Sequence, residues 1–439
     1  MKRGILILAA SMILATSMLV HAQVGNGLPI PDAPGASSSP SDGTVIETPT
    51  ILIDTPVAQQ QAPQGPWTMP QPKILQKNRI MIGGWLHQGI TVNGDSPASG
   101  FNGPVATNDL DGEYQMNQFW IWMHRQADTS DGGFDIGGHV DMMYGTDWRF
   151  GINNGLETKI NGFHGQTYGT VIPQAYVELA YNKLSVKLGH FAAQPFDFEA
   201  IPAPMNPFYS HSYGYGYGIP QLVTGVTGDY RLTDRLTLTA GVHQGWFQFK
   251  DNNDSLDILA GFKWTSEDQG TSLSYGISSG KQGSPLPDEN RFISSLVIQH
   301  QLTENLKYVF VNNLGIEDYA PGFVMDKAEW YGVNQYLMYA INSKWAANLR
   351  FEWFRDDDGV RVAGPGNIPG VRAFDGRGYA GHFYEVTTGL NWRPAPNWVV
   401  RPEARWDWYD GLAGPVGLPF NDGLKASQFT AAVDVIFTF

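Results

Sequence analysis

Three residues with acid–base side chains lie close together in the sequence, Asp135, His139 and Asp141. Residues separated by an even number of positions on a β-strand point to the same face, so a strand here would bring one imidazole and two carboxylates together. Such a group could bind a metal ion or transfer protons. No further ligand and no nucleophile can be placed beside it, and a water-facing strand surface accounts for the same pattern.

Oxygen-bearing side chains also alternate at Asp251, Asn253, Ser255 and Asp257, as they do at the start of a calcium-binding loop. That loop needs Gly at its sixth position and Glu at its twelfth, and this sequence has Leu256 and Phe262 there. We interpret the segment as a solvated loop. The sequence contains no Cys, which excludes disulfides and thiolate metal sites. We therefore predict no catalytic residue, no metal and no cofactor, and expect that the protein is not an enzyme.

The elements that must position these residues are strands with one polar and one apolar face. In residues 398–410, Trp, Val and Ala alternate with Arg401, Glu403, Arg405 and Asp407. A charged face opposite an apolar face is typical of a strand between water and hydrocarbon, as in a membrane β-barrel. The side chains that we expect on the inner wall of this barrel are Asp135, His139, Asp141, Lys187, Arg350, Glu352, Arg401, Glu403, Arg405 and Asp407.

The last twelve residues, 428–439, show the same alternation and end on an aromatic residue. Phe429, Val433, Phe437 and Phe439 fall on one face of the expected strand. This ending resembles the closing strand of bacterial outer-membrane β-barrels, in which the assembly machinery reads the terminal aromatic. We therefore assign Phe437 and Phe439 to a barrel-assembly signal.

The segments between the expected strands alternate in length. The short ones are residues 128–132, 182–183, 233–235, 266–270, 303–305, 342–344 and 393–397. The long ones are residues 93–112, 145–170, 193–221, 250–255, 280–290, 317–327, 356–379 and 411–425. Short periplasmic turns and longer external loops are the layout of an outer-membrane barrel. The fold class that we predict is all-β, an antiparallel up-and-down transmembrane barrel of about sixteen strands with both termini in the periplasm.

The third long segment contains a run of aromatic residues separated by glycines. Tyr209, His211, Tyr213, Tyr215 and Tyr217 alternate with Ser or Gly. A glycine-spaced segment of this kind can fold back into a wide barrel and narrow it, or it can pack on the rim. The sequence leaves both arrangements open.

The N-terminal part differs from the remainder. Residues 1–22 have two basic residues, an apolar run and a small-residue cleavage site at Ala22, which is typical of a secretory signal peptide. Residues 23–77 are rich in Pro, Gln and Ser, and we expect a disordered periplasmic leader. The barrel then occupies residues 78–439. The formal net charge of −14 becomes −16 when Lys2 and Arg3 are removed, which argues against nucleic-acid binding.

Aromatic residues make up 13% of the sequence, and we expect many of them at the ends of strands, where amphipathic rings settle at the level of lipid headgroups. The residues assigned to these two belts are Trp85, Trp120, Trp122, Tyr181, Tyr230, Trp246, Trp264, Trp330, Tyr331, Trp345, Trp392, Trp398, Trp408 and Tyr409.

Three segments carry a resemblance to a known family. They are Gly-Gly-Trp-Leu-His-Gln-Gly at 83–89, Phe-Glu-Ala-Ile-Pro-Ala-Pro-Met-Asn-Pro-Phe-Tyr-Ser-His-Ser-Tyr at 198–213 and Gly-Val-His-Gln-Gly-Trp at 241–246. Over residues 79–439 the sequence resembles the OmpL-like outer-membrane β-barrel porins, a planctomycete-type family. The resemblance implies a channel fold and assigns neither a solute nor functional residues.

The resulting hypothesis is a porin in the bacterial outer membrane, through which small polar solutes or ions diffuse passively. Its expected partners are membrane lipid, the barrel-assembly machinery and other copies of itself in a homo-oligomer such as a trimer. Two other classes remain open: a structural protein that ties the outer membrane to the cell wall, and a barrel hydrolase. The negative net charge predicts a weak preference for cations, whereas Arg361, Arg372 and Arg377 in one loop would favour anions if that loop folds inward.

Overall fold

We describe a computed structural model of the chain for residues 67–162, 166–193, 195–282, 290–318, 327–362, 378–413 and 417–439. The signal peptide, its cleavage site, most of the predicted leader, and Arg372 and Arg377 lie outside these residues. Within them, no helix is long and apolar enough to cross a membrane.

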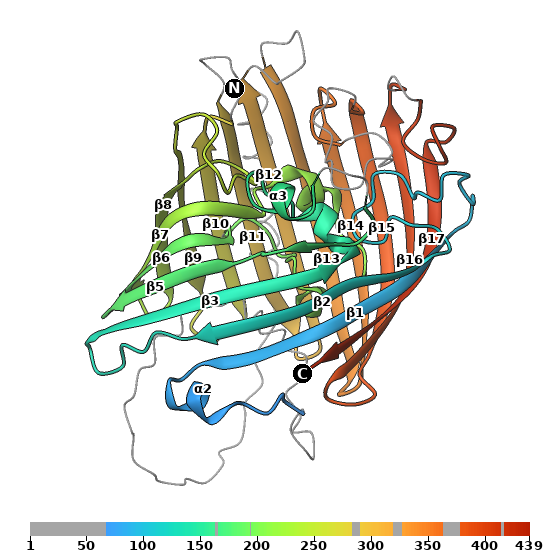
Figure 1. Cartoon of the computed structure of the whole chain (residues 1–439). Helices are drawn as coiled ribbons and strands as arrows, with labels where there is room; N and C mark the ends of the chain where they lie inside the picture. The colour runs from blue at the N-terminus through green and yellow to red at the C-terminus, as the bar shows by residue number, and fades with distance from the viewer. Residues whose placement is uncertain are drawn as a thin grey trace, which may run out of the picture. The chain divides into compact units, whose positions relative to one another are not determined.

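The chain forms a closed antiparallel β-barrel (Figure 1). Strand β1 pairs with both β2 and β17, which closes the ring. Strand β3 pairs with the short β4 at one end and with β5 along the remainder. Strands β4 and β5 therefore occupy a single strand position in the ring, which has sixteen such positions. This confirms the predicted all-β antiparallel barrel of about sixteen strands. The strands are β1 Met81–Asn93, β2 Tyr114–Arg125, β3 Phe134–Gly145, β4 Gly169–Val171, β5 Ala175–Tyr181, β6 Leu184–Ala192, β7 Leu222–Thr233, β8 Leu236–His243, β9 Asp257–Thr265, β10 Thr271–Gly280, β11 Arg291–Thr303, β12 Leu306–Asp318, β13 Lys327–Asn342, β14 Trp345–Asp356, β15 Gly381–Trp392, β16 Trp398–Gly411 and β17 Ser427–Thr438.

The two ends of the barrel differ in their connections. Short turns join the strands at one end, here called the short-turn end, and longer segments join them at the other, the long-loop end. Strand β1 begins at the short-turn end, and β17 finishes beside it, where the backbone of Phe439 exchanges two hydrogen bonds with Gly84 (Figure 1). In the part of the chain that the structure describes, five short helical segments accompany the strands: α2 Lys73–Lys77, η1 Thr146–Phe150, α3 Glu157–Ile160, η2 Ala203–Met205 and η3 Gly214–Gly218.

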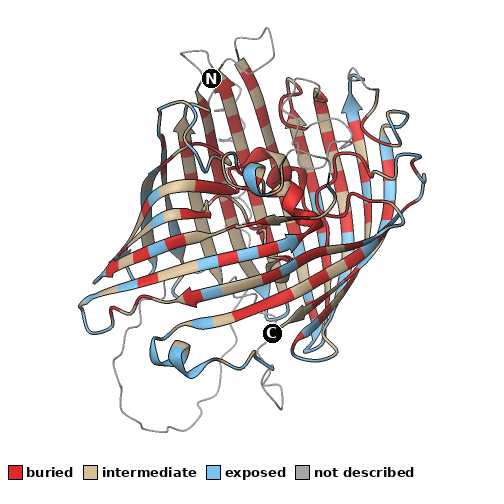
Figure 2. Cartoon of the chain, in the orientation of Figure 1, coloured by how far each residue is buried: buried red, intermediate tan, exposed pale blue. Residues whose placement is uncertain are grey.

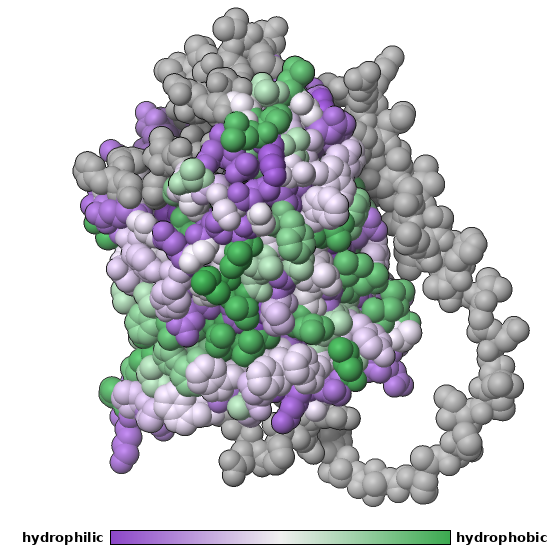
Figure 3. Space-filling view, turned by 90° about the vertical axis from the view of Figure 1, so that its right-hand side faces the viewer, coloured by the Kyte–Doolittle hydropathy of each residue, from purple (hydrophilic) through white to green (hydrophobic). Residues whose placement is uncertain are grey.

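Side chains alternate between the two faces of the sheet, and the register keeps one inner face continuous around the ring. On β16, Arg401, Glu403 and Arg405 are buried, whereas Trp398 and Trp406 on the other face are exposed. The same alternation of buried and exposed residues runs along the strands in Figure 2. Figure 3 shows one side of the barrel, with hydrophobic residues mainly over its lower and middle part and hydrophilic residues gathered above them. An apolar outer face with a polar inner face suits a barrel in lipid.

Six of the fourteen residues assigned to the aromatic belts face the interior instead, and that part of the prediction is wrong. The inward-facing residues are Trp85, Trp120, Trp122, Trp246, Trp330 and Tyr409. Trp246 lies beyond the end of strand β8, which stops at His243. Gly245 there adopts a φ of +97°, which favours glycine and breaks the alternation. The chain then turns Trp246 into the barrel, where it packs against Trp330.

The segment before β1 is attached to the short-turn end. Asn397 accepts a hydrogen bond from the backbone N–H of Trp67 at 2.8 Å and donates to its carbonyl at 2.7 Å. The Trp67 ring stacks on Phe437 of β17, with 6.3 Å between ring centroids. Gln71 exchanges two hydrogen bonds with the backbone of Ile82. Residues 67–77, which we assigned to the disordered leader, thus contain helix α2 and contact the barrel.

Candidate channel lumen

The connection from β6 to β7 lies inside the barrel. Its two ends meet where the N–H of Ala193 donates to the carbonyl of Gln221 at 3.0 Å. Between them, residues 195–221, here called the inner loop, contact strands on opposite sides of the ring. Ser295 of β11 donates to the carbonyl of Phe196, and Gln118 of β2 donates to that of Ile201 at 2.8 Å. The structure therefore favours the lumen over the rim as the location of this segment.

Carboxylates of the barrel wall accept backbone N–H groups of the inner loop. Glu403 of β16 accepts from Tyr209 at 2.9 Å and from Ser210 at 3.2 Å. Glu352 of β14 accepts from Tyr213 at 2.6 Å and from Gly214 at 2.7 Å. Both carboxylates are buried. Because a buried N–H without a partner is costly, these bonds fix where the loop backbone lies.

Three arginines bind carbonyl groups of the same loop. Arg350 of β14 donates to the carbonyl of Ser210 at 2.8 Å, Arg401 of β16 to that of Asn206 at 2.6 Å, and Arg405 to that of His211 at 2.6 Å. Each guanidinium also pairs with a buried carboxylate. The pairs are Arg350 with Glu385 and Glu199, Arg401 with Asp434, and Arg405 with Asp407.

Glu199 is the most heavily bonded residue of the inner loop. It accepts from Arg350, from His211 and from the hydroxyl of Tyr336, each at 2.8 Å. Burial alone would raise the pKa of Glu199, but Arg350, His211 and Tyr336 more than offset that effect and lower the pKa to about 2. Glu199 is therefore charged at neutral pH and ties the loop to β13 and β14.

Asp197 of the inner loop has the opposite shift. Burial raises its pKa, the neighbouring charge of Glu199 raises it further, and the resulting pKa is about 7. Its Oδ1 accepts the N–H groups of Phe198 at 2.7 Å and Glu199 at 3.0 Å. The charge of this carboxyl therefore changes near neutral pH while its neighbour stays ionised.

The aromatic run of the inner loop is held by hydrogen bonds and stacking. The hydroxyl of Tyr209 donates to Asn117 at 2.9 Å, that of Tyr213 to Asp407 at 2.7 Å, and that of Tyr217 to the carbonyl of Pro104 at 3.1 Å. The His211 ring stacks on Tyr215, with 4.6 Å between centroids. Gly89 of β1 leaves room for this packing, since a Cβ there would lie 2.8 Å from the Tyr209 ring.

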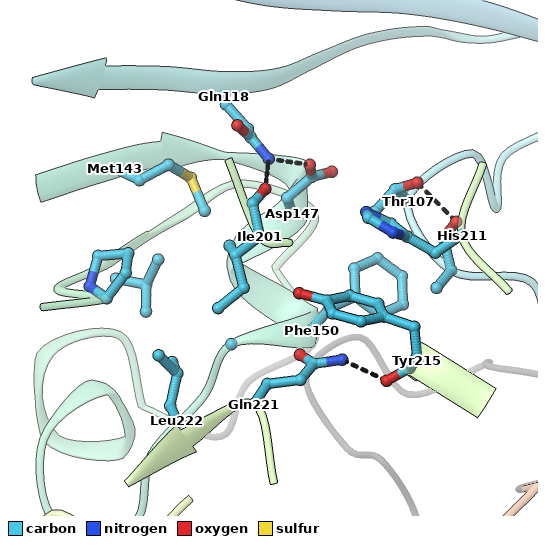
Figure 4. Close-up of a pocket in the computed structure, with 14 residues that line it drawn as sticks. Thr107, Gln118, Met143, Asp147, Phe150, Ile201, His211, Tyr215, Gln221 and Leu222 are labelled. Carbon is cyan, nitrogen blue, oxygen red and sulfur yellow. Dashed lines mark hydrogen bonds between the residues drawn. The ribbon is translucent and has the colours of Figure 1, made fainter. Parts of the chain in front are cut away.

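Other segments from the long-loop end join the inner loop. Arg149 of η1 forms two hydrogen bonds of 2.7 Å with Asp109, and the hydroxyl of Thr107 donates to the carbonyl of Tyr209 at 3.0 Å. A pocket lies among these segments (Figure 4). Its lining includes Asp147 and Tyr215, and the space left for water is about 20 Å³, enough for about one molecule. These segments therefore pack closely against the inner loop at the long-loop end.

The remaining predicted wall residues lie on the opposite side of the ring, on β3 and β6. His139 is 2.8 Å from Asp141 and 3.1 Å from His124 of β2. Asp135 forms ion pairs with Arg79 and Arg125. Lys187 of β6 lies over the ring of Tyr176 at 5.2 Å. No group that could hold a metal ion is found among the described residues.

Comparison with known proteins extends this description. The family model described as "Putative beta-barrel porin-2, OmpL-like" matches residues 79–439. The chain belongs to this family. The match confirms the resemblance seen in the sequence, and it identifies the protein as a porin of the bacterial outer membrane.

Solved structures share the fold of the porin at low sequence identity. The outer membrane channel DcaP of Acinetobacter baumannii has a TM-score of 0.54 at 12% identity, covering 86% of this chain and 100% of the other. An anion-selective porin from Comamonas acidovorans has a TM-score of 0.54 at 10% identity, covering 82% and 99%. The trimer form of in-vitro folded OmpT of Vibrio cholerae has a TM-score of 0.50 at 9% identity, covering 82% and 99%. No curated protein sequence matches the chain.

The sequence placed the wall residues of the porin on strands, but it did not predict their contacts with the inner loop. Arg350, Arg401 and Arg405 are 0%, 2% and 1% exposed, because the inner loop covers them where open water was expected. Glu199, Glu385, Asp434 and His87 were missed. His87 of β1 lies 2.7 Å from Asp434. A signal for Asp434 existed, since it is the one charged residue in the last strand.

Proposed function

We propose that this porin lets small polar solutes diffuse across the outer membrane through its lumen, and that the inner loop sets the upper size of those solutes. The observation that carries the proposal is the closed sixteen-position barrel with a charged inner wall and an apolar outer face. A barrel of this size is too wide for its own wall side chains to fill, so a water channel remains unless other segments occupy it.

The inner loop supports the second part of the proposal. It crosses the lumen and bonds to β2, β11, β14 and β16. Residues 107–109 and 146–150 pack beside it inside the barrel. A solute must therefore be small to pass.

Incorporation of the purified protein into planar lipid bilayers tests the channel. We expect discrete conductance steps, and swelling of proteoliposomes in small sugars that declines steeply with sugar size. The same preparation after heat denaturation is the control. A folded, heat-modifiable sample that gives no conductance steps would contradict the proposal.

Three further properties of the porin are its oligomeric state, its orientation in the membrane and its route of assembly. We propose a homo-oligomer such as a trimer, with the termini in the periplasm, and assembly through recognition of Phe437 and Phe439. Phe439 is well placed for the latter, since it lies at the junction of β17 with β1. Cross-linking in native membranes tests the oligomer, and protease access from the periplasmic side tests the orientation.

Signal-peptide cleavage near Ala22 and a tethering role of the leader are also proposals. Because Trp67 and Gln71 contact the barrel, a leader deletion should stop at residue 66. Loss of cell-wall co-sedimentation without loss of conductance in that variant would favour the wall-linking hypothesis. We expect no enzymatic activity, and hydrolysis of ester or peptide substrates by the purified protein would contradict that expectation.

A further inference from the structure

The ring of strands has one junction that the chain itself does not connect. Every other pair of neighbouring strands is joined by a turn, a loop or the short strand β4, because those strands follow one another in the sequence. Strands β1 and β17 are held together by the ladder between them and by two backbone hydrogen bonds between Gly84 and Phe439. At this junction, here called the seam, the ring can open without stretching any connection.

Residues 67–79, here called the latch, reach across the seam at the short-turn end. Asn397, in the turn between β15 and β16, holds the last strand and the latch at once. Its side-chain amide donates to the carbonyl of Thr438 at 2.6 Å and to that of Trp67 at 2.7 Å. Its side-chain oxygen accepts the N–H of Trp67 at 2.8 Å, and its backbone carbonyl accepts that of Thr438 at 2.9 Å. Asn397 is 8% exposed, so water competes little for these bonds.

The aromatic ring of Trp67 adds an apolar contact on the outer face of the barrel. It stacks on Phe437 of β17, and Phe437 also packs against Trp398 of β16 and against Phe439. Phe439 in turn lies beside Phe119 of β2, with 6.5 Å between ring centroids. These rings form a continuous row from β16 across the seam to β2. In Figure 1 the latch runs from α2 along the short-turn end toward the C-terminus.

The other end of the latch is fixed to β1 and to the strands beyond it. Gln71 donates to the carbonyl of Ile82 at 2.7 Å and accepts its N–H at 2.8 Å. Between these two residues the chain folds back through α2. Arg79 forms ion pairs with Asp128, in the turn after β2, and with Asp135 of β3. The latch therefore contacts both sides of the seam.

The bonds of Gln71 make the connection across the seam short. Along the chain Trp67 is fifteen residues before Ile82 but only four before Gln71. Because the entropy cost of holding the ends of a tether together rises with its length, the shorter tether favours the docked latch roughly fivefold. Over this short tether Trp67 can reach Asn397 only when β17 lies beside β1.

We propose that the latch locks the closed barrel: it docks after β1 and β17 have paired, and it slows the reopening of the seam. Interactions that form after the transition state of folding slow unfolding and leave the folding rate almost unchanged. The latch should therefore act on the lifetime of the closed barrel rather than on the rate at which the barrel forms. This role goes beyond the channel function and is independent of the solute that passes.

Point variants of the full-length mature protein test the latch. Its unfolding from lipid vesicles in denaturant is followed by the loss of heat-modifiable migration, and its folding by the appearance of that migration. Loss of an aromatic pair in Trp67→Ala should speed unfolding about two- to tenfold, and the longer tether in Gln71→Ala should speed it roughly fivefold. Trp67→Phe should retain most of the effect of the ring. Ile74→Ala is the matched control, because Ile74 is an apolar side chain of α2 that is 65% exposed, against 55% for Trp67.

Additivity of the two substitutions provides a second readout. Contacts that stabilise separate parts of a protein have independent effects, so their effects on the rate multiply. In the latch, a short tether is of little use once the grip on β17 is weakened. The double variant Trp67→Ala/Gln71→Ala should therefore unfold more slowly than the product of the single effects predicts.

Hydrogen exchange locates the effect in the barrel. Local opening exposes only the amides of the segment that opens. Weakening the latch should therefore increase exchange along β1 and β17, whereas β9 and β10, which lie half-way around the ring, should stay protected.

Four results would overturn the proposal. The first is an unfolding rate in both single variants equal to that of Ile74→Ala. The second is an equal rise of exchange in all strands, which would indicate general stabilisation rather than a lock on the seam. The third is a pair of effects that multiply. The fourth is slower folding, or failure to fold, in the single variants, which would mean that the latch acts before the barrel closes.

Discussion

Replacing Arg350 by Met should release part of the inner loop from the barrel wall. Arg350 is fully buried and forms five hydrogen bonds, with Glu385, Glu199, Thr387 and both the carbonyl and hydroxyl of Ser210. The substitution keeps a long side chain but leaves Glu199 and Glu385 buried beside each other without their cation.

Removing one partner of a buried ion pair costs about 3–5 kcal/mol. Because about 1.4 kcal/mol corresponds to a tenfold change in an equilibrium constant, the ratio of docked to released loop should fall by roughly two to nearly four orders of magnitude. The expected result is a larger and noisier single-channel conductance, together with a lower temperature for heat-induced migration on gels.

Arg355→Met is the matched control on the same strand. Arg355 is on the outer face, 23% exposed, and pairs with Asp357, which is 37% exposed. Partly exposed pairs of this kind contribute about 0–1 kcal/mol, so both measurements should remain close to those of the unmodified protein. If Arg350→Met lowered the unfolding temperature but left conductance unchanged, the loop would have stayed in place, and the assigned anchoring role of Arg350 would be refuted.

Three further predictions concern assembly, register and pH. Deleting Phe439 removes two backbone hydrogen bonds to Gly84 and should strongly reduce the yield of heat-modifiable barrel in the outer membrane. A normal yield would argue against the assembly signal. Cysteine introduced at position 187 or 263 should react with a small water-soluble thiol reagent. Cysteine at position 404 should be protected by lipid, and cysteine at position 405 by the inner loop. Labelling at position 404 but not at 263 would mean that the register is inverted. Burial and Glu199 raise the pKa of Asp197 from 3.8 to about 7, so the folded state holds this proton more tightly than the unfolded state. The unfolding temperature should therefore fall as pH rises from about 4 to about 7 and should level off above pH 7. Asp197→Asn should flatten this part of the profile. An unchanged slope in the variant would exclude Asp197 as the source of the pH dependence.

The barrel, and the face of each strand that points to lipid or to water, could be predicted from the sequence. The alternation on β16, for example, places Trp398 and Trp406 on one face and Arg401 and Arg405 on the other, and it is encoded entirely within one strand. Local information of this kind is sufficient because the side-chain period of a strand is two, whatever the strand pairs with. The lengths of the turns added the approximate number of strands.

The segments inside the lumen and the exposure of its charged side chains depend on how distant parts of the chain pack together. Glu199 and Arg350 are 151 positions apart, and their contact depends on the course of the inner loop across the barrel. The same holds for Trp246, which the alternation placed outside but which turns inward after Gly245. Lys263 and Arg405 both lie on polar strand faces, yet one borders water and the other is buried. The difference arises because the inner loop packs on Arg405 and leaves Lys263 exposed. The sequence of a strand does not show which distant segment will pack against it.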